Sequence, residues 1–164
     1  MKRILIALLP LLLLLTPCLA RAQSVTGAFF DRYSKAEGYA SVQLERKMMR
    51  MMSRQAADKG DEQLAKLLDG IQYIRIVALK EGDRTQLLRD VEILTTNPLY
   101  KFQLVMSESE SGQTTRFYLR ELRNSYNSEL LMLTYGEKET VVVNIYGEFD
   151  LRQVVRLSTI RPKP

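Results

Sequence analysis

The spacing of apolar residues changes near residue 98, and this change restricts the possible folds more than any other feature. Before it, apolar side chains recur mainly at helical intervals, and after it they alternate with polar ones as in β-strands. Helices followed by hairpins predict an α+β fold. We expect a single domain, with a mainly antiparallel sheet and several helices packed on one face.

Turn and capping residues divide this pattern into elements. Asp83 and Gln86 resemble the two ends of a capping box, and Asp61 can cap a helix that ends at Gly70. A last helix is expected to start at Asp150. The sequence predicts further helices over 26–37, 46–57 and 87–96, strands over 39–44 and 71–79, and hairpins of 100–106 with 117–119 and of 128–135 with 140–146.

The first hairpin carries a candidate binding surface. We expect the polar segment 108–112 to form its loop, Phe102 to face Leu119, and Leu104 to face Phe117. The outward face would then be basic, with an aromatic side chain at its centre. Such a face suits an acidic sugar, a phospholipid head group or an acidic patch of a partner, although a solvated sheet face has the same composition. The candidate binding residues are Lys101, Arg116, Tyr118 and Arg120.

The first 22 residues have the pattern of a secretory signal peptide. Lys2 and Arg3 precede an apolar run over 4–15, which is too short to span a bilayer, and the segment 20–22 reads Ala-Arg-Ala. We therefore expect an exported, periplasmic protein with a signal peptide over 1–22, a domain over 23–160 and a flexible tail over 161–164. A lipoprotein anchored at Cys18 is the alternative, which the preceding proline disfavours.

Loss of the signal peptide changes the composition that bears on function. Three of the 24 basic residues lie in it, so the mature chain would have 21 basic and 19 acidic residues, which gives no support for nucleic-acid binding. The only cysteine would also be lost, so the mature chain would contain no disulfide.

Histidine is absent from the whole chain. Catalytic triads, cysteine–histidine pairs and histidine-bound zinc are therefore excluded. We predict no catalytic residue, metal site or cofactor. The alternative is a carboxylate-based hydrolase of envelope glycan, for which the candidates are Glu137, Glu139, Glu148 and Asp150.

The segment "ERKMMRMMSR" over 45–54 is the most unusual stretch of the chain. On a helix, Leu44, Ala56 and the four methionines 48, 49, 51 and 52 share one side, and the basic residues share the other. Methionine is a good filler of irregular cores, so a core role is the first interpretation. A partner-binding surface and a Cu(I) site remain open alternatives.

Three segments together resemble a known family. They are "YASVQLERKMMRMM", "LLDGIQYIRIV" and "VVVNIYGEFDLRQVVRLS". They are similar to the small exported proteins of domain-of-unknown-function family 4252. This resemblance implies a secreted α+β domain of Gram-negative envelopes, in which some members are encoded beside extracytoplasmic-function sigma factors. It assigns no catalytic residue.

These observations combine into one functional expectation. We expect an exported, non-catalytic binding or accessory protein of the cell envelope, with a possible role in envelope sensing or homeostasis. Its partner would be a protein or another envelope component.

Overall fold

The computed structural model describes residues 25–122, 125–152 and 154. The predicted signal peptide over 1–22, Cys18 and the predicted tail over 161–164 lie outside the described residues. In chain order the elements are α2 (Gly27–Tyr33), β1 (Tyr39–Glu45), α3 (Arg46–Asp58), α4 (Glu62–Gly70), β2 (Ile71–Leu79), α5 (Thr85–Thr96), β3 (Gln103–Glu110), β4 (Gln113–Glu121), β5 (Ser128–Gly136) and β6 (Thr140–Gly147).

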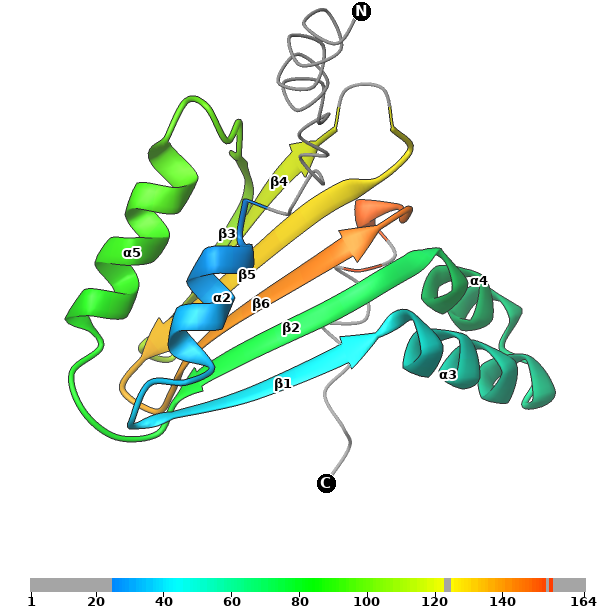
Figure 1. Ribbon diagram of the computed structural model, residues 1–164, viewed down its shortest axis with the longest axis horizontal. Coiled ribbons are helices and arrows are strands. Elements are labelled where there is room, and N and C mark those ends of the chain that lie inside the picture. Colours follow the sequence, from blue (N-terminus) through cyan, green and yellow to red (C-terminus); the bar gives the residue numbers. More distant parts are fainter. Residues whose placement is uncertain (1–24, 123–124, 153, 155–164) are drawn as a thin grey trace, which may run out of the picture.

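Six strands of the described chain form one antiparallel sheet in the order β1-β2-β6-β5-β4-β3 (Figure 1). The last strand, β6, lies between β2 and β5, so it joins the early strands to the two later hairpins. β1 and β3 form the edges. The predicted α+β fold and single domain are confirmed, because one sheet connects the early and late parts of the chain.

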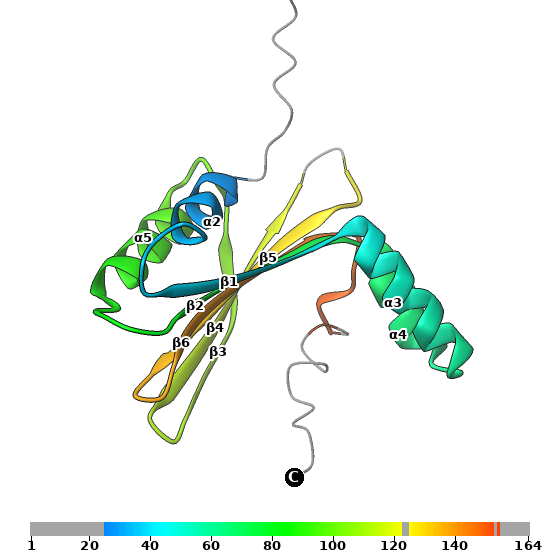
Figure 2. The same cartoon turned by 60° about the horizontal axis from the view of Figure 1, so that its bottom comes forward.

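Helices pack against both faces of the sheet: α2 and α5 lie over one face, whereas the α3–α4 hairpin packs at one end of the other (Figure 2). The prediction of one covered face is therefore wrong in this detail. On the face packed against α2 and α5, here called the α5 face, Val77, Val142 and Leu133 lie side by side. The opposite face, here called the α4 face, is also apolar through residues such as Ile74 and Leu130. Because both faces are apolar, each needs a cover.

On the α5 face, α2 and α5 form one packed layer. Phe30 and Leu87 are buried against the sheet, and the ring of Phe29 lies 4.8 Å from that of Tyr33. The Tyr33 hydroxyl donates a 2.8 Å hydrogen bond to Asp90 Oδ2 of α5. Helix α2, which consists of only seven residues, is therefore held by α5 as well as by the sheet.

Helices α3 and α4 form a hairpin that projects from one end of β1 and β2 (Figure 2). Met49 is fully buried in its core, with Leu67 and Leu68 of α4. Asp61 caps α4 as predicted, since its carboxylate accepts a 3.0 Å hydrogen bond from the Leu64 amide. Among the described residues, no helix has the length and apolar character needed to cross a membrane.

Two predictions about helix ends need correction. Helix α2 covers Gly27–Tyr33, which is shorter than the predicted 26–37. Asp83 forms no capping box with Gln86: its carboxylate accepts hydrogen bonds from the amide and the hydroxyl of Thr85, at 2.9 and 2.7 Å. The Asp83 carboxylate accepts from the backbone two residues further along the chain. This contact forms an Asx-type turn that precedes α5.

The first hairpin differs most from the prediction. Its strands run to a two-residue turn, where Ser111 and Gly112 have φ values of 52° and 77°. Two successive positive φ values are typical of the tight turns that match strand twist. The predicted loop over 108–112 is therefore mostly strand. Leu104 faces Tyr118 and Met106 faces Phe117, with an irregularity between them, so the predicted register is wrong.

Candidate functional site

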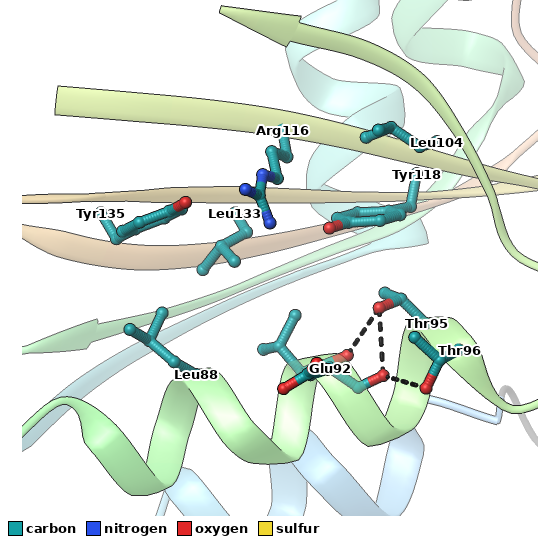
Figure 3. Close-up of a pocket in the computed structure, with 10 residues that line it drawn as sticks. Leu88, Glu92, Thr95, Thr96, Leu104, Arg116, Tyr118, Leu133 and Tyr135 are labelled. Atoms are coloured by element: carbon teal, nitrogen blue, oxygen red, sulfur yellow. Dashed lines mark hydrogen bonds between the residues drawn. The ribbon is translucent and has the colours of Figure 1, made fainter. Parts of the chain in front are cut away.

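A groove of about 460 Å³ lies between α5 and the sheet and is called here the α5 groove (Figure 3). Its sheet wall comes from β3, β4 and β5, and its helix wall comes from one side of α5. The residues that line it are Leu88, Val91, Glu92, Thr95, Thr96, Leu104, Arg116, Tyr118, Leu133 and Tyr135.

Strand and helix periodicity place these side chains together. Arg116 and Tyr118 are two residues apart on β4, so they project from the same face, and pairing with β5 puts Leu133 opposite Arg116. On α5, Leu88, Glu92 and Thr95 share the side that faces the sheet, because residues four and three apart lie on one side of a helix. The groove is thus a product of regular structure rather than of flexible loops.

Arg116 is the central charge of the α5 groove. Its guanidinium lies between the two tyrosine side chains, whose hydroxyl groups are directed toward it (Figure 3). Its Cζ atom is 5.6 Å from the centre of the Tyr135 ring. A hydrogen bond with Tyr118, together with nearby Tyr135, raises the pKa of Arg116 above its usual value. Arg116 is therefore a fixed positive charge.

No ion pair joins Arg116 to a carboxylate within the described ranges. Glu92 lies on the opposite wall of the groove and is exposed. The hydroxyl of Thr95 donates 2.9 Å to Val91 O, and that of Thr96 donates 2.8 Å to Glu92 O. Both threonine oxygens can still accept hydrogen bonds. The groove therefore offers one cation, one carboxylate and several hydroxyl groups.

The structure separates the four candidate binding residues of the first hairpin. Arg116 and Tyr118 line the α5 groove, so their face is turned toward α5 and not outward as predicted. Arg120 lies further along β4 and pairs with Glu129 at 3.1 Å. Lys101 is exposed, precedes β3 and has a φ of 58°. Only two of the four thus share a cavity.

A buried polar cluster beside α2 was not predicted from the sequence. The Glu129 side chain is fully buried on β5, and its Oε1 accepts hydrogen bonds from the Thr26 hydroxyl at 2.6 Å and the Asn144 amide at 3.2 Å. Thr26 and Asn144 are also fully buried. A charged residue within the apolar β5 sequence was the available signal. Its partners come from segments far away in the sequence, Thr26 at the start of α2 and Asn144 on β6, which no local pattern brings together.

Comparison with protein families gives a match over residues 33–157, to the family described as Domain of unknown function (DUF4252). The chain belongs to this family. The match covers β1 to β6 and therefore the whole sheet. Comparison with curated proteins and with solved structures finds no match.

The DUF4252 domain has a second groove, of about 1050 Å³, along α3 and the end of β1, called here the α3 groove. The methionines predicted to share one side of this helix differ in their burial. Met49 is fully buried and Met52 is half-buried, whereas Met48 and Met51 are 41% and 49% exposed. The α3 groove is lined by Gln43, Leu44, Glu45, Lys47, Met48, Arg50, Met51, Arg54 and Gln55.

The four carboxylates of the hydrolase hypothesis are not gathered into one site. Glu139 precedes β6 and Glu148 follows it, so the extended strand holds these two residues roughly 30 Å apart, at about 3.3 Å per residue. This is far beyond the separation of a glycosidase pair. Glu139 accepts 3.0 Å from the Gln113 amide, and Asp150 pairs with Arg152 at 3.4 Å. Within the described residues, no group of three or more aspartates and glutamates could hold a metal ion.

Proposed function

We propose that this DUF4252 protein is an exported, non-catalytic binding protein of the cell envelope, which binds an anionic sugar in the α5 groove. The observation that carries this proposal is Arg116, held between Tyr118 and Tyr135 at the groove wall. A guanidinium presents its N–H donors in a fork that matches a carboxylate or a phosphate. Tyr118 and Tyr135 flank this fork and direct their hydroxyl groups toward it (Figure 3).

The walls of the groove favour a sugar over a simple anion. Tyr118 and Tyr135 offer flat apolar rings with polar ends, a combination that suits a ligand with both apolar and hydroxylated surfaces. Glu92 and Thr96, on the facing helix, can accept hydrogen bonds from sugar hydroxyl groups. The volume of about 460 Å³ is in the usual range for small-molecule sites.

Two features support binding in the envelope rather than catalysis. The chain contains no histidine, so the usual proton shuttle at neutral pH is missing. The sequence pattern over 1–22 is that of a signal peptide, which would take the protein to the periplasm. The proposed partner is therefore an acidic saccharide of the envelope, and an anchor at Cys18 remains the alternative to a free domain.

Ligand titrations followed by NMR test the proposed binding. We would titrate the protein with glucuronate, glucose 6-phosphate and glucose. We expect both anionic sugars to shift the resonances of residues at the groove, and glucose to bind at least about tenfold more weakly, since it lacks the charge-assisted pair. The relative affinities of the two anionic sugars tell whether a carboxylate or a phosphate is preferred.

Two variants distinguish the groove from general positive charge. Arg116→Met is expected to remove the preference for anionic sugars. Arg89→Met, which changes an exposed cation of α5 that does not line the groove, is the matched control and should bind as the wild type does. Equal binding of all three sugars, or equal loss in both variants, would contradict the proposed function.

Export is tested separately. The full chain is expressed in a Gram-negative host, the cells are fractionated, and the intact mass of the mature protein is measured. A periplasmic protein that begins at Gln23 is the expected result. A lipidated Cys18 in the membrane fraction would instead show an anchored protein.

A further inference from the structure

We infer that the α3 groove docks an acidic, amphipathic helix of a partner protein. This inference goes beyond ligand binding in the α5 groove and does not depend on it. The two grooves lie in different parts of the molecule, since one is formed by α5 with β3 to β5 and the other by α3 with the end of β1. A small ligand and a protein partner could therefore be bound together.

The apolar part of the α3 groove is made by side chains that the domain itself leaves exposed. Met48 and Met51 are three residues apart, so they lie on one side of α3, next to Leu44 at the end of β1. Their neighbour Met49 is fully buried, which shows that the domain fills its own core without them. Methionine side chains are flexible and polarizable, and they adapt well to the side chains of a partner helix.

The charges around these methionines define the partner. Lys47, Arg50 and Arg54 lie three and four residues apart along the same groove, and none of them forms an ion pair with a described residue. Arg46, by contrast, serves the fold: its guanidinium donates 2.6 Å to Asp69 O and 3.2 Å to Ile71 O.

Among the described residues that line the groove, Glu45 supplies the only carboxylate, and it accepts a hydrogen bond from the Gln43 amide. An excess of cations around an apolar strip matches a helix with apolar residues at i, i+3, i+4 and i+7 flanked by aspartate and glutamate.

Two other occupants fit the α3 groove less well. A second copy of the chain, bound through the same groove about a two-fold axis, would bring the three cations close to their own counterparts. An anionic membrane would satisfy the charge. However, helices that lie in membranes usually present tryptophan, phenylalanine and leucine, whereas α3 exposes methionines in a concave surface.

An unbiased peptide selection tests this inference. The full chain is expressed in a Gram-negative host and purified as the host processes it. It is then used to select from a phage-displayed library of random peptides of about 16 residues, slightly longer than the 13 residues of α3. The Met48→Ala/Met51→Ala variant serves for counter-selection. We expect enriched sequences with acidic residues around apolar residues at helical spacing.

The best peptide is then measured by fluorescence anisotropy against three variants. Met48→Ala/Met51→Ala and Lys47→Glu/Arg50→Glu/Arg54→Glu should each weaken binding by about tenfold or more. The matched control is Lys35→Glu/Lys66→Glu/Arg89→Glu, which reverses three exposed cations outside the groove and should bind as the wild type does. Circular dichroism of each variant confirms that it is folded.

Several results would overturn the inference. They are the enrichment of no groove-dependent peptide, the enrichment of peptides that are not acidic, and equal weakening by the control variant. Binding to phosphatidylglycerol vesicles that requires Met48 and Met51, with no peptide selected, would make a membrane the occupant. A dimer that Met51→Arg dissociates would make a second copy the occupant. Sugar binding by Arg116 is measured independently. A negative result in the peptide selection therefore does not contradict ligand binding in the α5 groove.

Discussion

Arg120 Nη2 lies 3.1 Å from Glu129 Oε2 across the pairing of β4 and β5, and the Glu129 side chain is fully buried. Burial of a carboxylate is costly unless it is paired and hydrogen-bonded. Here the second oxygen of Glu129 accepts from Thr26 at 2.6 Å and from Asn144 at 3.2 Å. The cluster therefore ties the start of α2 to the centre of the sheet.

Replacement of Arg120 by methionine should strongly destabilise the fold. The substitution keeps most of the apolar stem but removes the guanidinium that pairs with the buried Glu129 carboxylate. Loss of one partner of a buried pair typically costs about 3–5 kcal/mol. Urea unfolding followed by circular dichroism measures the free energy of unfolding of Arg120→Met against the wild type.

Two further variants test whether burial of the Glu129 charge causes the loss of stability in Arg120→Met. The double variant Arg120→Met/Glu129→Gln removes that charge and should recover part of the lost stability. Arg152→Met breaks the exposed pair with Asp150, at 3.4 Å, and should leave the free energy of unfolding unchanged. Equal losses in Arg120→Met and Arg152→Met would show that burial of Glu129 is unimportant.

The contact between Tyr33 and Asp90 predicts a loss of stability at high pH. Burial, followed by the hydrogen bond to Asp90, raises the pKa of Tyr33 above its usual value near 10. The folded state therefore retains the phenol proton more tightly than the unfolded state. The stability that this contact contributes is fully present below the unfolded pKa and is lost as the pH rises through the folded pKa.

The variant Tyr33→Phe isolates this effect. Near pH 7 it should be less stable than the wild type by about 1–2 kcal/mol, because the hydrogen bond to a carboxylate is lost. The difference should narrow above about pH 10, as the wild-type phenol begins to ionise in the unfolded state. Urea unfolding from pH 7 to pH 11 provides the measurement. A difference that stays constant over this range would rule out the proposed linkage.

Local sequence signals predicted most of the elements, because their boundaries depend on nearby residues. Strand β2 covers Ile71–Leu79 as predicted, since Gly70 ends the preceding helix and a polar segment follows the apolar run. Helix α3 was also predicted to within one residue. The register of the first hairpin was not, because Val105 continues an apolar run and hides the irregularity between Leu104 and Met106.

The candidate site was only partly predictable for a related reason. Alternation placed Arg116, Tyr118 and Arg120 on one face of β4, which the register confirms. It could not show which face of the sheet α5 covers, since apolar residues occur on both. It also could not show that Arg120 would meet Glu129, because that contact depends on the pairing of β4 with β5. Whether these residues bind a ligand remains a prediction.

A close contact between two glycine positions predicts a steric effect. A β-carbon on Gly70 would lie 1.9 Å from Glu148 O, and one on Gly147 would lie 2.4 Å from Gly70 O. The segment after β6 therefore packs directly on the backbone at the end of α4, where the Glu148 amide donates 2.9 Å to Gly70 O. Gly70→Ala should cost about 3 kcal/mol of stability, since backbone must move to make room.

Gly60→Ala is the control for this substitution. Gly60 has a φ of 80°, but a β-carbon there would meet no atom within 4 Å. Its cost should be about 1 kcal/mol, from the left-handed conformation alone. Thermal unfolding of both variants measures the difference. If Gly60→Ala were as destabilising as Gly70→Ala, the contact between the end of α4 and the segment after β6 would not matter for stability.

Replacement by alanine should destabilise the protein at one of two adjacent methionines on α3 and have almost no effect at the other. Met49 is fully buried with Leu67 and Leu68, so Met49→Ala leaves a cavity and should cost about 2–5 kcal/mol. Met48 is 41% exposed and lines the α3 groove, so Met48→Ala should leave the free energy of unfolding almost unchanged. Urea unfolding of the two variants gives both values.

A large loss of stability for Met48→Ala would mean that this side chain belongs to the core of the domain, and it would then be unsuitable as a contact for a partner helix. A small loss for Met49→Ala would mean that α3 is not held by the packing described here. The predicted contrast requires that one methionine supports the fold while its neighbour remains free for binding.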